Sequence, residues 1–291
     1  MRLRLGLHPH NLSLRVLSGT HILEDYLHGR NVDIEWVRFP DGPRTPDYIG
    51  AGILDIGGTG ATPPIAGQAK GIPLVYVATS AGRAFGGIAV AADGPIRELA
   101  DLQGKRVGLA AGSWLQALLV TALGEAGVPW SEIVPLDLPD GHAEAALRRG
   151  GIDAWATGNL LEDPAFRFVA RTGGIISNPS VFFAGRAFAE DHRDVLERVV
   201  AAIDDADAWT ATHSTAAAHI LAADAEFGGK RIAWEAVVRA RAWGLRAIED
   251  GFLDEQQRTA DAFFRHGLIG RRIDVRDAQL ARALAVGTVG V

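Results

Sequence analysis

Apolar and polar residues alternate in short runs along the first third of the chain, and segments with helical spacing separate these runs. Residues 3–7 and 32–39 have the period of two that is typical of half-buried strands. Residues 13–27 have apolar positions at helical spacing, and 45–51 could form one short helix. Strands that alternate with helices predict a parallel sheet covered by helices, so the fold class is α/β.

A glycine-rich segment, residues 57–68, lies between two apolar runs at 53–56 and 72–77. This order predicts strand, glycine turn, helix and strand. Thr62 is a good helix N-cap and Pro63 fits the first helical position. The free N–H groups of such a helix end favour an anionic or strongly polar ligand. The segment matches neither the dinucleotide fingerprint nor the P-loop.

The same arrangement returns further along the chain, where an apolar strand at 106–110 leads into Gly112-Ser113 and a helix that runs to about residue 124. More strands are predicted at 87–91, 133–138 and 152–156. A turn-rich segment at 174–183 could carry the chain back to the first unit, and helices dominate from 187 onward. The prediction is therefore two lobes, one made of residues 1–84 plus 184–291 and the other of residues 85–183.

Composition narrows the classes of partner and cofactor. The 291 residues are 48% hydrophobic, enough for a sizeable core, and the net charge of −6 argues weakly against nucleic acid. No cysteine is present, which excludes disulfides, thiolate nucleophiles and cysteine-bound metals. No apolar run reaches the length of a membrane span. The histidine pair His8 and His10 has no evident third ligand nearby, so no metal and no cofactor is expected.

The first residues contain no apolar signal core, no small-residue cleavage site and no lipidated cysteine. The expected location is the cytoplasm if Met1 is the native start. It is the periplasm or the exterior if an export signal has been removed.

Several short motifs occur in a fixed order along nearly the whole chain. They are Leu5-Gly6-Leu7, Asp33-Ile34-Glu35-Trp36, Leu54-Asp55-Ile56-Gly57, Thr62-Pro63-Pro64-Ile65, and the segments 71–77, 99–108, 151–155, 267–269 and 273–275. This ordered set resembles the sulfonate, taurine and nitrate-type substrate-binding proteins of ABC importers. The resemblance implies the type II periplasmic binding-protein fold, in which two α/β lobes flank a cleft. It also implies a small anionic ligand at strand C-termini and helix N-termini, and an ABC permease as partner.

The chain departs from that family pattern in two ways. It has no export signal, and Thr157-Gly158-Asn159 stands where the family often has Trp-Asp-Pro. The same fold hosts cytoplasmic enzymes, among them an aryl-sulfinate desulfinase, hydroxyphthalate decarboxylases and the pyrimidine synthase of thiamin biosynthesis. The Gly57-Gly58 and Pro63-Pro64 pattern is similar to the desulfinase motif, and His8 stands in place of its nucleophilic cysteine.

Two functions therefore remain open at the level of sequence. The first is a receptor for a small organic anion, sulfonate-like or carboxylate, that serves an ABC importer. The alternative is an enzyme, a lyase or hydrolase acting on an aromatic or heterocyclic acid, with His8 and His10 as acid–base groups.

The candidate ligand contacts lie in loops and turns that follow predicted strands. They are His8, His10, Asn11, Thr59, Gly60, Thr62, Thr79, Ser80, Ser113, Trp114, His142, Asn159 and Asn178. Structural roles compete at several of these positions. Thr62 could serve as a cap, Trp114 could pack between lobes, and Asn178 could belong to a hinge or turn. His142 could be an incidental loop histidine.

Overall fold

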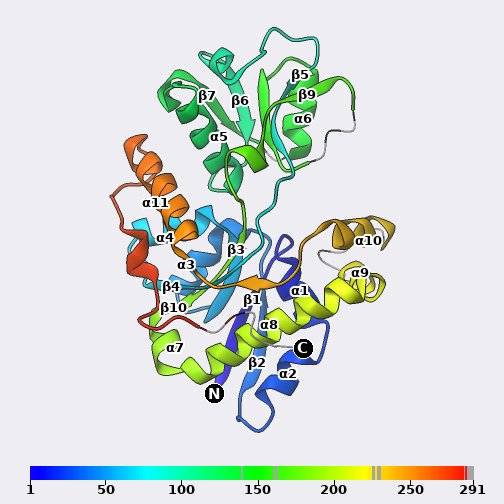
Figure 1. Cartoon of the computed structure of the whole chain (residues 1–291), viewed down its shortest axis with the longest axis vertical. Coiled ribbons are helices and arrows are strands. Elements are labelled where there is room, and N and C mark those ends of the chain that lie inside the picture. Colours follow the sequence, from blue (N-terminus) through cyan, green and yellow to red (C-terminus); the bar gives the residue numbers. More distant parts are fainter. Residues whose placement is uncertain are drawn as a thin grey trace. The chain divides into compact units, whose positions relative to one another are not determined.

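The computed structural model of the protein describes residues 1–138, 140–159, 161, 163–224, 227, 231–284 and 286 (Figure 1). The chain forms two units, each with its own sheet and core. Unit 1 comprises Met1–Ala81, Pro179–Leu253 and Asp274–Val291, and unit 2 comprises Gly82–Asn178 and Asp254–Ile273. Two separate sheets agree with the predicted α/β fold class.

The sheet of unit 1 has the strand order β11-β4-β10-β3-β1-β2. Its strands are β1 (Arg2–Leu7), β2 (Asp33–Arg38), β3 (Ile56–Gly60), β4 (Leu74–Ser80), β10 (Ser180–Gly185) and β11 (Leu245–Arg246). β1 pairs in parallel with β2 and β3, whereas β10 runs antiparallel between β3 and β4. The carboxyl ends of β1 and β3 therefore meet at one edge of the sheet, where β10 begins.

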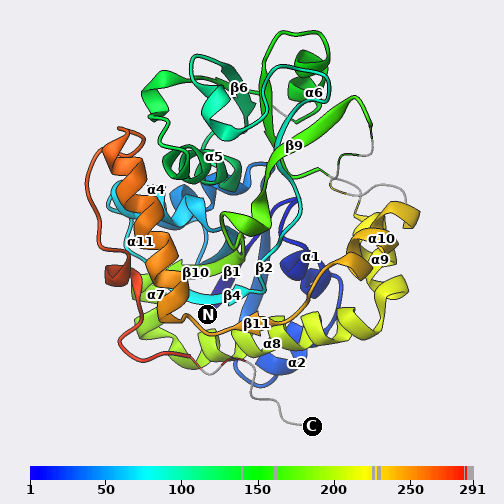
Figure 2. The same ribbon diagram turned by 45° about the horizontal axis from the view of Figure 1, so that its top comes forward.

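Nine helices carry residues of unit 1 within the described part of the chain. They are α1 (Leu12–Ser18), α2 (Ile22–Leu27), α3 (Thr45–Gly50), α4 (Thr62–Ala69), α7 (Arg186–Asp191), α8 (Arg193–Thr212), α9 (Ser214–Ala223), α10 (Arg231–Ala240) and α11 (Asp250–Arg265). The boundary with unit 2 falls inside α11. The long helix α8 packs against α1 and α2 (Figures 1 and 2). Its apolar face joins Leu3, Leu5 and Leu14 in one buried core.

The single helix predicted over 13–27 is in fact two helices, α1 and α2. The first ends at Gly19, whose backbone N–H bonds to the carbonyls of Val16 and Leu17. A Cβ at Gly19 would lie 2.3 Å from Cγ2 of Ile220 on α9. A glycine is therefore required where α1 ends against that helix.

The glycine turn predicted before Thr62 is also wrong, because Gly57, Gly58 and Gly60 lie in strand β3. The glycines at 57 and 58 permit close packing: a Cβ on Gly57 would lie 2.4 Å from Cγ2 of Thr45. Helix α4 begins at Thr62 with Ala61 as its N-cap, so Thr62 is not the cap and the Thr62-Pro63 pair sits one position deeper than expected.

Unit 2 has a sheet of order β7-β6-β8-β5-β9. Its strands are β5 (Gly87–Ala91), β6 (Arg106–Leu109), β7 (Val134–Asp137), β8 (Ala154–Thr157) and β9 (Phe166–Arg171). Helix α5 (Trp114–Glu125) covers one face and α6 (Asp140–Arg148) the other. Strand β9, which pairs antiparallel with β5, was not predicted from the sequence.

The observed units differ from the predicted lobes in three places: residues 82–84 and Asp254–Ile273 belong to unit 2, and residues 179–183 belong to unit 1. Residues 180–185 form β10, which pairs with β3 and β4, so they belong to the sheet of unit 1 rather than to the second lobe. The two ends of the first segment of unit 2, Gly82–Asn178, are bonded together: the backbone N–H of Arg83 donates to the carbonyl of Ser177 at 2.8 Å. Among the described residues, no helix has both the length and the apolar character needed to cross a bilayer.

Candidate ligand-binding site

Six of the predicted contact residues lie at the edge of the unit 1 sheet where β1, β3 and β4 end. They are Asn11, Thr59, Gly60, Thr62, Thr79 and Ser80. Strand β10 starts at the same edge, because Ser180 pairs with Gly60, and its backbone N–H donates to Oγ of Ser80 at 2.9 Å. Topology thus gathers these residues from three separate parts of the chain.

Asn11 is one of two buried side chains at this edge that have unused hydrogen-bonding capacity. It is 1% exposed, and its Oδ1 caps α1 by accepting from the N–H of Leu14 at 3.0 Å. Its Nδ2 has no partner within the described residues. A Cβ on Gly58 would lie 2.4 Å from that Nδ2, so the missing side chain of Gly58 makes room for the amide.

Replacing Gly58 by alanine is expected to lower the free energy of unfolding by about 1–3 kcal/mol, because the added methyl overpacks a buried position. It would meet Nδ2 of Asn11 at 2.4 Å and Cδ1 of the buried Phe182 at 2.7 Å. Urea unfolding measures the change. The matched control is Gly124→Ala, since no atom lies within 4 Å of its Cβ position near the end of α5. Equal effects of both substitutions would contradict the packing argument.

Thr62 is the second such side chain. It is 1% exposed at the first position of α4, and its Oγ1 has no hydrogen-bond partner in the part of the chain described. Pro63 and Pro64 follow and have no N–H, so α4 offers fewer backbone donors than a helix start normally does. The hydroxyl of Thr62 is therefore the more important donor at this helix end.

Arg241 is a residue at the same edge that the sequence analysis missed. It follows α10, is partly buried, and its Nη2 donates to Oγ of Ser180 at 3.3 Å. Its guanidinium lies 5.0 Å from the ring centroid of Trp243. Burial lowers the pKa of Arg241 while the nearby Asp207 carboxylate raises it, and an arginine so placed remains a cation. No motif marks this arginine, because its place depends on how the α10–β11 connection packs.

His8 has a structural role in the observed conformation. Its ring is 1% exposed, Nε2 donates to the carbonyl of Gly58 at 2.7 Å, and Nδ1 accepts from the backbone N–H of His10 at 3.3 Å. Burial lowers the pKa of His8 to about 4. Both ring nitrogens are therefore occupied and the ring is neutral, which does not support the predicted ligand contact or acid–base role. His10 is exposed in the same loop.

Two further predicted residues lie together in unit 2, after the carboxyl end of β6. Ser113 is the N-cap of α5: its Oγ accepts from the N–H of Leu115 and donates to the carbonyl of Ala110 at 2.7 Å. Trp114 packs edge-on against the exposed ring of Phe85, with centroids 6.3 Å apart. The hydroxyl of Ser113 is thus used by its own helix, while Trp114 belongs to an aromatic pair within unit 2.

The remaining candidates in unit 2 are more dispersed. Asn159 is exposed just after β8, and His142 is exposed inside the first turn of α6, not ahead of that helix as expected. Asn178 is buried at positive φ (47°), and its carbonyl accepts from Nε of Arg83 at 3.0 Å. Neither amide atom of Asn178 has a partner among the described residues, so turn geometry and ligand contact still compete there.

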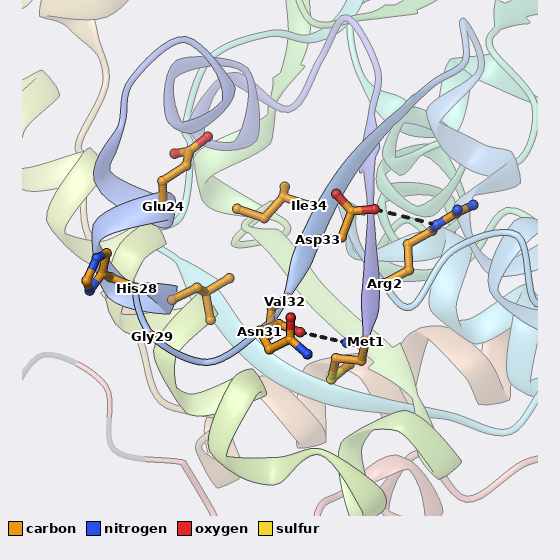
Figure 3. Close-up of a pocket in the computed structure, with 10 residues that line it drawn as sticks. Met1, Arg2, Glu24, His28, Gly29, Asn31, Val32, Asp33 and Ile34 are labelled. Carbon is orange, nitrogen blue, oxygen red and sulfur yellow. Dashed lines mark hydrogen bonds and ion pairs between the residues drawn. The ribbon is translucent and has the colours of Figure 1, made fainter.

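A hollow of about 600 Å³ lies elsewhere in unit 1 (Figure 3). It is bordered by the starts of β1 and β2, including Arg2 and Asp33, whose side chains form an ion pair at 3.9 Å. This is the opposite end of β1 from Asn11, and none of the predicted contacts lines the hollow. The described residues contain no group of three or more histidine, aspartate or glutamate side chains that could hold a metal ion.

Comparison with known proteins identifies the family. The family model described as NMT1/THI5 like matches residues 23–217. A protein of Escherichia coli K12 that is named for binding aliphatic sulfonates is 31% identical over 284 residues, which span 94% of this chain and 87% of that protein.

Two solved structures are similar over nearly their whole length. The periplasmic aliphatic sulphonate binding protein SsuA from Escherichia coli has a TM-score of 0.83 and 29% identity, with 96% of this chain and 97% of that chain covered. The alkanesulfonate-binding protein SsuA from Xanthomonas axonopodis pv. citri, bound to MOPS, has a TM-score of 0.80 and 28% identity over 96% and 98% of the two chains. These matches confirm the predicted resemblance and the type II periplasmic binding-protein fold. The chain belongs to the NMT1/THI5-like family.

Proposed function

We propose that this protein is the receptor of an ABC importer and binds an organic sulfonate at the edge of the unit 1 sheet described above. The observation that carries the proposal is that two buried polar atoms without a partner among the described residues, Nδ2 of Asn11 and Oγ1 of Thr62, lie at the same edge as the cation Arg241. The relatives that match nearly the full chain are named for sulfonate binding, which supports the choice of ligand class.

The chemistry of the edge suits a sulfonate. A sulfonate carries three acceptor oxygens and one negative charge, and it takes up no proton near neutral pH. Nδ2 of Asn11, the hydroxyl of Thr62 and the guanidinium of Arg241 can all donate. One cation together with neutral donors can compensate one negative charge in a partly desolvated site, whereas an uncompensated charge there would be costly. A carboxylate has only two oxygens in one plane, so it would use fewer of these donors.

The enzyme alternative gains nothing from this geometry. The enzyme was considered because His8 stands in the place of a catalytic cysteine. Both nitrogens of that buried ring bond to backbone groups, so neither is available to a substrate in the observed conformation. A general acid or base must reach the proton that it transfers. We therefore favour the receptor over the enzyme, and we expect the ligand-loaded protein to deliver its ligand to a permease.

Thermal unfolding tests the ligand class. Sodium butanesulfonate should raise the melting temperature increasingly with concentration, because a ligand that binds only the folded state contributes about 2.7 kcal/mol at 100 times its Kd. For a chain of this size that corresponds to a shift of several degrees, at roughly 2–4 °C per kcal/mol. Pentanoate has the same four-carbon tail and should shift the transition less. Stabilisation by butylamine but not by butanesulfonate would refute the proposal.

A further inference from the structure

The connection that carries Arg241 is fastened to helix α8 by two carboxylates. Oδ2 of Asp207 accepts from the backbone N–H of Gly244 at 3.1 Å, and Oδ1 of Asp204 accepts from that of Leu245 at 2.8 Å. Gly244 has a φ of 107°, in the region that glycine readily adopts and other residues rarely do. The path of residues 241–245, and with it the position of Arg241, therefore depends on these two aspartates.

Asp207 is deeply buried, at 1% exposed, as against 7% for the ion-paired Asp55. Its Oδ1 has no hydrogen-bond partner in the described part of the chain, although the Ser13 hydroxyl on α1 is close enough to favour the charged form. Burial raises the pKa of Asp207 to about 6, while Ser13, Arg241 and the Gly244 N–H act in the opposite direction and Asp204 adds to the rise. A buried carboxylate with so few hydrogen bonds costs stability, which suggests a functional role.

Other charged or titratable side chains lie on the elements packed against α8. They are Arg15 on α1, Glu24, Asp25 and Tyr26 on α2, Arg186, Glu190 and Asp191 on α7, His219 on α9, Glu235 and Arg239 on α10, and Arg246 on β11. Several of these are engaged away from Asp207. Arg15 pairs with Asp224, Tyr26 donates to Asp205, and Arg239 donates to Ser214.

We propose that Asp207 is a positioning residue for the sulfonate site: it holds the connection bearing Arg241 in place, and its own negative charge weakens the binding of an anion beside Arg241. The inference rests on the proposed function, since it assigns a role in anion binding at the same edge. Asp207 contacts the backbone of that connection and interacts with Arg241 electrostatically, so it acts through Arg241 and not on the ligand directly.

Protonation of Asp207 should strengthen the binding of an anion beside Arg241. Asp207 is negative above about pH 6 and becomes neutral below it, while a sulfonate keeps its charge throughout. Removing the negative charge next to Arg241 favours the bound anion, so affinity should rise as the pH falls. By linkage, the bound anion should raise the pKa of Asp207 and cause proton uptake. If anion binding raises the pKa of Asp207 by about one unit, protonation of Asp207 lowers the Kd for the anion by about tenfold.

The test is calorimetric titration with sodium butanesulfonate between about pH 5 and pH 8. We expect up to about tenfold tighter binding at the acid end for the wild-type protein. In Asp207→Asn the amide oxygen can still accept from Gly244, so affinity should stay near the acid wild-type value at every pH. Asp204→Asn is the matched control, one turn away on α8 with the same kind of backbone contact. It should keep a pH dependence of binding, but with the transition at lower pH, because Asp204 no longer adds to the raised pKa of Asp207.

Four results would overturn the inference in different ways. Binding with no pH dependence in the wild type, or pH dependence that Asp207→Asn retains, refutes the role of Asp207 but leaves the proposed function intact. No binding of butanesulfonate at any pH refutes both. If Asp207→Asn fails to fold, wild-type titrations in two buffers of different ionisation enthalpy decide the matter, because net proton uptake near pH 6 is required and its absence refutes the inference.

Discussion

Replacing Arg241 by glutamine is expected to weaken butanesulfonate binding by at least roughly 30-fold, equivalent to about 2–5 kcal/mol, since removal of the cation leaves a partly buried anion with neutral donors only. Glutamine keeps a neutral donor but carries no charge. Arg241→Lys keeps the charge and loses the planar fork, so its affinity should fall between the two. Calorimetric titration at fixed pH and salt measures all three proteins.

The control for Arg241→Gln is Arg239→Gln on α10. Arg239 is exposed and donates to Oγ of Ser214 on α9. Its replacement removes the same charge from a neighbouring position and leaves the sheet edge unchanged. The control should change Kd by less than about twofold at moderate ionic strength. Equal losses in both variants would mean that long-range charge, and not the position of Arg241, governs binding.

Acidification is expected to destabilise the native protein through His8. The folded pKa of about 4 lies below the ordinary value of 6.5, with burial as the main cause. The stability gained by keeping the ring neutral is therefore fully present above pH 6.5 and is lost as the pH falls toward about 4. That loss amounts to about 3 kcal/mol at 1.36 kcal/mol per pKa unit.

Urea unfolding of the wild type and of His8→Gln between about pH 4 and pH 7.5 isolates this effect. Glutamine cannot be protonated, so the stability difference between variant and wild type should change in favour of the variant by about that amount on acidification. His28→Gln, at an exposed position of the same unit, should follow the wild-type profile. Parallel profiles for wild type and His8→Gln would show that His8 is not held neutral by burial.

The strand and helix order was largely predictable from the sequence because the hydrophobic period reports directly which face of an element is buried. The alternation at 32–39 became β2, and the region from 187 onward, where helices were expected to dominate, contains α8. The glycines of 57–60 were misjudged for a physical reason: in β3 they permit tight packing against Thr45, Asn11 and Phe182, and local sequence cannot distinguish such a strand from a turn.

The candidate site was only partly predictable. Asn11, Thr62 and Ser80 follow predicted strands, and strand ends in a parallel sheet meet at one edge, so their proximity could be anticipated. The burial of His8 could not, because it depends on Gly42 and Phe39 closing over the ring. Arg241 was missed because it reaches the edge from a connection late in the chain, anchored by Asp207 and Asp204.

The most direct test of the central claim is a calorimetric titration of the wild-type protein with sodium butanesulfonate, followed by competition with pentanoate. We expect saturable binding of one sulfonate per chain at micromolar Kd or tighter, about −8 kcal/mol, and at least tenfold weaker binding of pentanoate. Absence of saturable sulfonate binding, or pentanoate displacing the sulfonate at equal concentration, would contradict a sulfonate receptor.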